Sequence, residues 1–182
     1  MTGRPTEQTA VFLGGRQAGC IGLLALLAAG WQVTAAVAYD DDLRRLAAAL
    51  GLPVAGSVDS AEVAAALPGS ALLVSVHGRQ IVQSAVLSQL PLGGINVHPC
   101  LYAYKGARPV ERLLADGNPR ASVGVHRMTD RLDEGELLVE RFVDVAGSTT
   151  VEGVYNALYP AYAAVLVEAL GVVRAARLRP TG

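Results

Sequence analysis

The chain has 182 residues, of which 52% are hydrophobic and 17% are charged. This length is typical of a single globular domain, and the low charge excludes an intrinsically disordered chain. The net charge of -1 leaves no excess of basic side chains for a nucleic-acid backbone or an anionic membrane. In the N-terminal half, polar residues interrupt every apolar stretch before the ~18 residues needed to cross a bilayer. We therefore expect neither nucleic acid nor a membrane as a partner.

Cys20 and Cys100 are the only cysteines of the sequence. They are too few for a disulfide scaffold and lack the CxxC spacing of zinc and redox motifs, so we expect a cytoplasmic location. The polar segment 1–8 lacks the apolar core of a signal peptide. We expect a disordered leader over residues 1–8 and a single domain over residues 9–182.

Short apolar runs alternate with amphipathic segments in the first hundred residues. The runs typical of strands are 10–13, 32–39, 71–76 and 94–98. The segments typical of helices are 21–29, 40–50, 60–67 and 81–90, where Asp40 or Asp41 caps the second and Ser60 caps the third. This alternation predicts an α/β fold with a Rossmann-like, mostly parallel sheet and helices on both faces.

The pattern changes after Pro99. A helix over about 109–116 precedes two extended segments, 122–128 and 136–144, which predict antiparallel strands added to the sheet. Thr149 and Glu152 form a capping-box pattern at the start of a long closing helix. The apolar positions of this helix, at helical spacing, are Val151, Val154, Leu158, Tyr162, Val165 and Leu166.

Asn96 and His98 lie on the predicted strand that Pro99 ends. Residues two apart on a strand point to the same face, so an amide and an imidazole lie side by side. Ligands of open α/β sheets bind beyond the carboxyl ends of parallel strands, which makes this pair a candidate catalytic centre. Two polar residues that only satisfy hydrogen bonds at a strand end are an equally good interpretation. The pair alone names no reaction.

Asp133 lies in a polar loop between the two predicted antiparallel strands. A carboxylate, an imidazole and an amide drawn together can orient a nucleophile, move a proton and stabilise an oxyanion. Asp followed by Glu and Gly is also common in ordinary turns, so this loop by itself favours turn chemistry.

Four ordered motifs carry a resemblance to a known family. They are Asn96-Val-His98-Pro, Tyr104-Lys-Gly-Ala-Arg-Pro109, Ser122-Val-Gly-Val-His-Arg-Met128 and Leu132-Asp-Glu-Gly135. Together with segments 19–30 and 46–54, the chain resembles the folate-dependent formyltransferase family over nearly its whole length. Within that family it is most similar to amino-sugar N-formyltransferases.

The resemblance implies that a formyl group moves from 10-formyltetrahydrofolate to an amine without a metal. Asn96, His98 and Asp133 fall on the catalytic triad of the family. Asn96 is then expected to bind the formyl oxygen as it becomes an oxyanion, and His98 to stabilise it or relay a proton. Asp133 is expected to polarise His98 and assist deprotonation of the amine.

The resemblance also implies where the folate binds. The corresponding residues supply backbone groups and apolar walls, as an apolar cleft for a folate needs. They are Gln80, Ile81, Val82, Thr129, Asp130, Arg131 and Leu132.

Departures from the family pattern bear on the acceptor. Residues 100–103 replace a common Ser-Leu-Leu-Pro, and the short segment 40–44 indicates a compact or unusual acceptor. The glycine-rich loop 14–19 lacks the phosphate-cradling pattern of glycinamide ribonucleotide formyltransferases, so purine synthesis is disfavoured. Arg16 either meets an acceptor phosphate or belongs to a loop without a ligand. The near-neutral charge disfavours a tRNA acceptor.

Other polar and aromatic residues favour structural interpretations. His126 is expected to make a structural hydrogen bond, and His77 has no motif support. Cys100 lies beside the candidate centre, but a covalent thiol mechanism is a minor alternative. Three tyrosines of the last helix are interpreted as core packing, or as a homodimer contact if they are exposed. They are Tyr155, Tyr159 and Tyr162.

Three functions remain open from the sequence. The first is N-formylation of a small amine, either a nucleotide-linked amino sugar or another biosynthetic amine. The second is hydrolysis of 10-formyltetrahydrofolate, because the same triad can direct water. The third is a non-catalytic folate-binding protein, which the intact triad disfavours.

Overall fold

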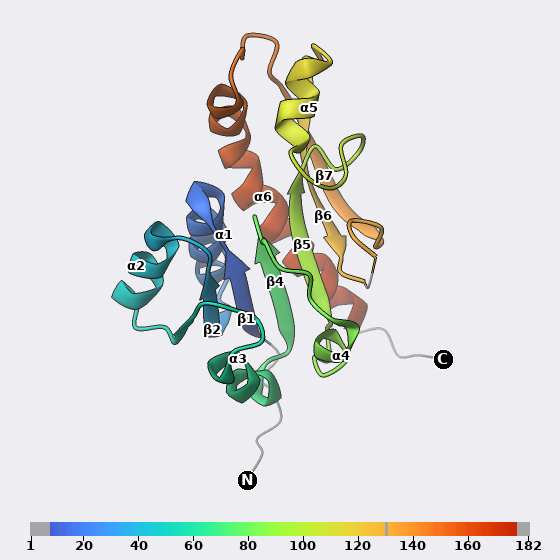
Figure 1. Cartoon of the computed structure of the whole chain (residues 1–182). Helices are drawn as coiled ribbons and strands as arrows, with labels where there is room; N and C mark the ends of the chain where they lie inside the picture. The colour runs from blue at the N-terminus through green and yellow to red at the C-terminus, as the bar shows by residue number, and fades with distance from the viewer. Residues whose placement is uncertain (1–7, 130, 178–182) are drawn as a thin grey trace.

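The computed structural model describes residues 8–129 and 131–177, and these form seven strands of one sheet (Figure 1). The strands are β1 Thr9–Gly14, β2 Gln32–Ala38, β3 Val54–Ala55, β4 Leu72–Val76, β5 Gly94–Pro99, β6 Arg120–Arg127 and β7 Leu137–Asp144. Their order is β3-β2-β1-β4-β5-β6-β7. Strands β1 to β5 pair in parallel with one another, β6 pairs antiparallel with β5, and β7 pairs antiparallel with β6. The predicted fold class is confirmed.

Helices cover both faces of this sheet, and a 3₁₀ turn follows α3 (Figure 1). The helices are α1 Arg16–Ala28, α2 Asp41–Ala49, α3 Ala61–Ala66, α4 Ser84–Leu87, α5 Pro109–Ala115 and α6 Val151–Arg177. The predicted caps of α2 and α3 are confirmed, because the side chains of Asp40 and Ser60 accept hydrogen bonds from the N–H groups of Leu43 and Val63.

Alternation along the buried strands divides the apolar residues between two cores. On β1, Ala10 and Phe12 belong to the core under α1, α5 and α6, whereas Val11 and Leu13 face the core under α3 and α4. All four are fully buried. Burial on both faces explains why the parallel strands are uniformly apolar in sequence.

Helix α6 is long and apolar enough to cross a membrane by length and composition alone. In the fold it packs against α1, α5 and the strands β5, β6 and β7. Of its predicted apolar positions, all except the half-buried Val151 are buried, as a core helix requires. Tyr162 is 1% exposed and belongs to the core, as predicted.

The predicted helix 81–90 is wrong over most of its length, since only the four residues of α4 are helical. The Gln80 side chain explains the difference. Its Oε1 accepts hydrogen bonds from the N–H of Val58 and from the Tyr39 hydroxyl, and its Nε2 donates to Ser57. These bonds hold the chain before α4 against the loop that follows β3.

Four smaller differences concern element boundaries. The two-residue strand β3 is too short to show a periodicity, and α1 begins five residues earlier than expected, at Arg16. The cap of α6 is Thr150, whose Oγ1 accepts a hydrogen bond from Gly153 N–H at 3.0 Å, rather than Thr149. Gln8, expected in the leader, accepts a backbone hydrogen bond from Gln32. Residues 1–7 of the expected leader lie outside the described residues.

Candidate active site

The pairing of β5 with β6 places Asn96 directly opposite His126 and His98 opposite Gly124. Asn96 and His98 alternate with the buried residues Ile95 and Val97, so both side chains project from one face at the carboxyl end of β5. The expected juxtaposition of the amide and the imidazole is thus present, and β6 adds a second imidazole beside it.

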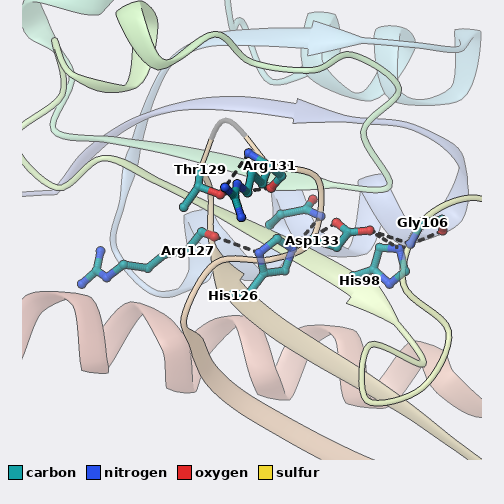
Figure 2. Close-up of polar contacts among 8 residues, drawn as sticks. His98, Gly106, His126, Arg127, Thr129, Arg131 and Asp133 are labelled. Atoms are coloured by element: carbon teal, nitrogen blue, oxygen red, sulfur yellow. Dashed lines mark hydrogen bonds and ion pairs between the residues drawn. The ribbon is translucent and has the colours of Figure 1, made fainter.

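Asp133 reaches this strand end from the loop between β6 and β7 (Figure 2). Its Oδ2 accepts a hydrogen bond from Gly106 N–H at 2.8 Å and lies 3.2 Å from His98 Nε2, while its Oδ1 lies 3.3 Å from His126 Nε2. The residue is 4% exposed and has a left-handed φ of 54°. One buried carboxylate therefore ties together β5, β6 and the loop before α5.

The proton of neutral His98 resides on Nε2, because this atom faces two acceptors, Asp133 Oδ2 and the carbonyl of Gly106, each at 3.2 Å. Burial lowers the pKa of His98, although Asp133 and the Gly106 carbonyl oppose the shift. The ring is therefore neutral at pH 7. Its Nδ1 is buried, makes no hydrogen bond with any described residue and offers a free lone pair.

Asp133 remains ionised beside this ring. Burial by itself raises the pKa of the Asp133 carboxyl, but hydrogen bonding from His126, the proximity of His98 and the Gly106 N–H together hold it below its usual value. A carboxylate next to Nε2–H fixes the tautomer of His98 and stabilises the imidazolium that forms when Nδ1 takes a proton.

His126 belongs to this network, although the sequence analysis left it out of the site. Its Nδ1 donates a hydrogen bond to the carbonyl of Arg127 at 2.8 Å, and its Nε2 lies 3.2 Å from Asn96 Nδ2 and 3.3 Å from Asp133 Oδ1. The predicted structural hydrogen bond of His126 therefore also orients Asn96. The register between β5 and β6 places His126 opposite Asn96, but the hydrophobic pattern of the sequence does not determine this register.

A small cavity of about 70 Å³ opens on the Asn96 side of the triad. It brings together all the described residues that were predicted to bind the donor. Its lining comprises Ser75, Gly78, Gln80, Ile81, Val82, Asn96, His126, Met128, Thr129, Arg131, Leu132 and Asp133. Asp130, also predicted to bind the donor, lies outside the described residues.

The loop side of this cavity is braced locally. Thr129 Oγ1 donates a hydrogen bond to the Arg131 carbonyl at 3.0 Å and accepts one from the Arg131 N–H at 3.3 Å (Figure 2). Ile81 and Leu132 remain 67% and 64% exposed, which is unusual for large apolar side chains. They leave apolar surface at the cavity that a ligand could cover.

A larger cavity of about 230 Å³ opens on the His98 side of the triad. Its lining comprises Arg16, His77, Gly78, His98, Pro99, Gly106, Ala107, Arg108, Pro109, Glu111 and Tyr155. Gly78 lines both cavities, and His98, Asn96 and Asp133 lie where the two meet. Groups bound in the two cavities would therefore both reach these three side chains.

Gly135 keeps the Asp133 loop close to β6. A Cβ at this position would lie 1.7 Å from the carbonyl oxygen of Arg127, so alanine cannot be accommodated without moving the backbone. We expect Gly135→Ala to lower the free energy of unfolding by about 2–4 kcal/mol and to reduce activity, measured by urea denaturation and turnover. Gly147→Ala, where a Cβ would meet nothing within 4 Å, is the matched control. Equal stability of the two variants would contradict this expectation.

His77 makes stability depend on pH. Burial, followed by the charges of Arg16 and Arg79, lowers the pKa of His77 to about 4 from its ordinary value of 6.5. The unfolded chain therefore binds more protons between these values, and stability should fall as pH drops from 6.5 to about 4. In urea denaturation across this range, His77→Asn, which tolerates the left-handed φ of 58°, should flatten the slope. His98 and, towards pH 4, carboxyls with a lowered pKa such as Asp133 supply the remaining slope, and an unchanged slope would refute the assignment to His77.

The model of the formyl transferase family matches residues 55–170, which is more than half of the chain. The chain belongs to the formyl transferase family. The expected family resemblance is thereby confirmed at the level of the family.

Relatives and solved structures extend this finding. A methionyl-tRNA formyltransferase of Chromohalobacter salexigens is 32% identical over 178 residues, covering 88% of this chain and 54% of the relative. This chain thus spans about half the length of that relative. The name of this relative gives methionyl-tRNA and no amino sugar, so the finer likeness to amino-sugar enzymes is a proposal.

Two solved structures share the fold. Phosphoribosylglycinamide formyltransferase from Anaplasma phagocytophilum has a TM-score of 0.80 at 17% identity, covering 96% of this chain and 90% of its own. A formyltetrahydrofolate deformylase from Pseudomonas syringae pv. tomato has a TM-score of 0.78 at 18% identity, covering 94% and 63%.

Proposed function

We propose that this chain is an N-formyltransferase that moves a formyl group from 10-formyltetrahydrofolate to the amine of a small acceptor. The observation that carries the proposal is the buried triad at the junction of two cavities, with His98 Nδ1 unpartnered among the described residues. Family membership supports the same reaction type. The nucleotide-linked amino sugar and other small biosynthetic amines are the acceptor classes proposed from the sequence.

The residues of the triad divide the chemistry between them. One Asn96 N–H is engaged with His126, and the second is available for the formyl oxygen as negative charge develops on it. His98 Nδ1 accepts the proton that the attacking amine loses, while Asp133 stabilises the resulting imidazolium. A carbon–nitrogen bond forms at the acceptor, the bond from the formyl carbon to the folate N10 breaks, and His98 returns the proton to that nitrogen.

The smaller cavity fits the ring system of the donor. It pairs apolar walls, including Ile81 and Leu132, with backbone groups of the loop around Thr129. Ile81→Ser and Leu132→Ser should each weaken 10-formyltetrahydrofolate binding by about tenfold without changing the melting temperature, because both side chains are exposed. Leu24→Ser, an exposed leucine on α1 that lines neither cavity, is the control. Unchanged donor affinity in both cavity variants, measured by fluorescence titration, would rule out this donor site.

Hydrolysis of the donor is the second candidate function. It is favoured by the shared fold with the deformylase structure and by the unpartnered His98 Nδ1, which could equally accept a proton from water. The two functions differ in one observable. Release of tetrahydrofolate depends on an added amine in a transferase and proceeds without one in a hydrolase.

The test follows donor cleavage by absorbance with a panel of acceptors. The panel contains a nucleotide-linked amino sugar, methionyl-tRNA, small amines and no amine. Saturable, amine-dependent cleavage with a formylated product supports the proposal. Amine-independent cleavage supports the hydrolase, and tight donor binding without cleavage supports a binding protein.

Two attributes of the whole chain accompany the proposal. We propose that residues 9–182 form one domain, because both cores pack on the same sheet. We also propose a cytoplasmic location, since Cys20 and Cys100 are both free thiols in the fold.

A further inference from the structure

The larger cavity, on the His98 side of the triad, is the acceptor-side cavity under the proposed function, and the smaller is the donor-side cavity. The N-terminus of α1 lies at the edge of the acceptor-side cavity and is already hydrogen-bonded to a carboxylate of the chain itself. The Asp40 carboxylate accepts hydrogen bonds from the backbone N–H of Arg16 and of Leu43, so it serves α1 while it caps α2. A Cβ at Gly15 would lie 2.9 Å from this carboxylate. A phosphate cannot use the first N–H of α1 unless it displaces Asp40.

The side chains of Arg16 and Arg108 are instead the cationic groups of this cavity. Neither takes part in an ion pair with any residue that the structure describes. Both have left-handed backbone conformations, with φ of 56° and 51°. Such conformations are uncommon for arginine and often mark positions that function requires.

Taken together, the titratable groups that line this cavity, including Arg16 and Arg108, carry one net positive charge. His77 and His98 are neutral near pH 7, because burial lowers the pKa of each. Glu111 is the single carboxylate among the lining residues and can attract the ammonium form of an amine. Both charges of an amino acid therefore have a partner of opposite sign in the same cavity.

The size of the cavity limits the acceptor. Its volume is about 230 Å³, and it opens to solvent. A nucleotide-linked sugar would extend beyond it. A short amine with one further polar group fits within it.

We propose that the acceptor is a small primary amine that carries a carboxylate, which Arg16 and Arg108 bind while the amine faces His98. The proposal rests on the formyl transfer proposed above. A planar guanidinium matches the two oxygens of a carboxylate, whereas the backbone nest that would suit a phosphate is occupied by Asp40. This assignment selects among the small biosynthetic amines and against the nucleotide-linked sugar.

The experiment compares acceptors that differ in one group. β-Alanine, its amide and 2-aminoethyl phosphate are tested together with the common α-amino acids and their amides. With the wild type, we expect the best carboxylate to exceed its amide and the phosphate in kcat/KM by about 10- to 100-fold. Arg16→Ala should abolish most of this preference through KM, and Arg44→Ala on α2 is the matched control, since Arg44 lines no part of the cavity.

Reversing the charge at position 16 should create a new acceptor preference, which a misfolded variant would not show. Arg16→Glu should shift the preference from amino acids toward diamines such as 1,3-diaminopropane. Equal use of amides, preference for the phosphate, or turnover of only the nucleotide-linked sugar or methionyl-tRNA would overturn the carboxylate assignment and leave formyl transfer standing. If none of these amines supported cleavage of the donor, both proposals would be overturned.

Discussion

Replacing His98 with alanine is expected to reduce amine-dependent turnover of 10-formyltetrahydrofolate by about 10²–10⁴-fold. In the proposed mechanism, His98 Nδ1, which is buried and unpartnered among the described residues, accepts the proton of the attacking amine. The substitution removes this acceptor and also the Nε2–H that bonds to Asp133 and Gly106. The measurement is initial rate by absorbance at saturating donor and acceptor.

Donor affinity is the control for this variant. Because His98 lines the acceptor-side cavity and not the donor-side cavity, the dissociation constant of 10-formyltetrahydrofolate should stay within a few-fold of the wild type. A variant that binds the donor and retains more than a tenth of the wild-type rate would contradict the role of His98.

Asp133→Asn is expected to lower turnover by about 10³-fold, with a smaller effect on donor affinity. A neutral amide can direct its N–H group toward His98 Nε2, which would disfavour the tautomer with a free Nδ1 and leave the imidazolium uncompensated. We also expect the free energy of unfolding at pH 7 to fall by about 1–3 kcal/mol, because the charged hydrogen bond from Gly106 N–H becomes a neutral one.

The pH dependence of this stability difference gives a second test. The pKa of Asp133 is held below its ordinary value of 3.8, so the stability that the charge contributes is complete above that value and is lost as pH falls through the pKa in the folded protein. The difference between wild type and Asp133→Asn should therefore shrink in strongly acidic solution. Glu136→Gln, on the same loop with an exposed side chain, should behave as the wild type. A difference that stays constant with pH would show that the charge is not responsible.

The parallel half of the fold follows from local patterns in the sequence. Uniformly apolar runs such as 71–76 and polar caps such as Asp40 mark buried strands and helix starts without knowledge of the tertiary structure. Local patterns predict segment 81–90 wrongly as a helix, because Gln80 is hydrogen-bonded to residues 22 and 41 positions away in sequence. Long-range hydrogen bonds of this kind leave no periodicity to detect.

The part of the candidate site that lies in sequence motifs could be predicted from the sequence. Asn96 and His98 share a strand face for reasons of geometry alone, and Asp133 joined them only through the family resemblance. His126 was missed because its role depends on which residue of β5 it faces, which is a matter of register between strands. The proposed role of Arg16 and its contact with Asp40 depend on how close the starts of α1 and α2 lie, which no local pattern encodes.

The central claim is that the triad at the junction of the two cavities transfers a formyl group to an amine. The most direct measurement incubates wild type and His98→Ala with 10-formyltetrahydrofolate carrying a labelled formyl carbon and the acceptor panel, and identifies the product by mass spectrometry. We expect the label on the acceptor nitrogen with the wild type and none above the uncatalysed background with the variant. Labelled formate with the wild type, formed equally without any amine, would contradict the claim.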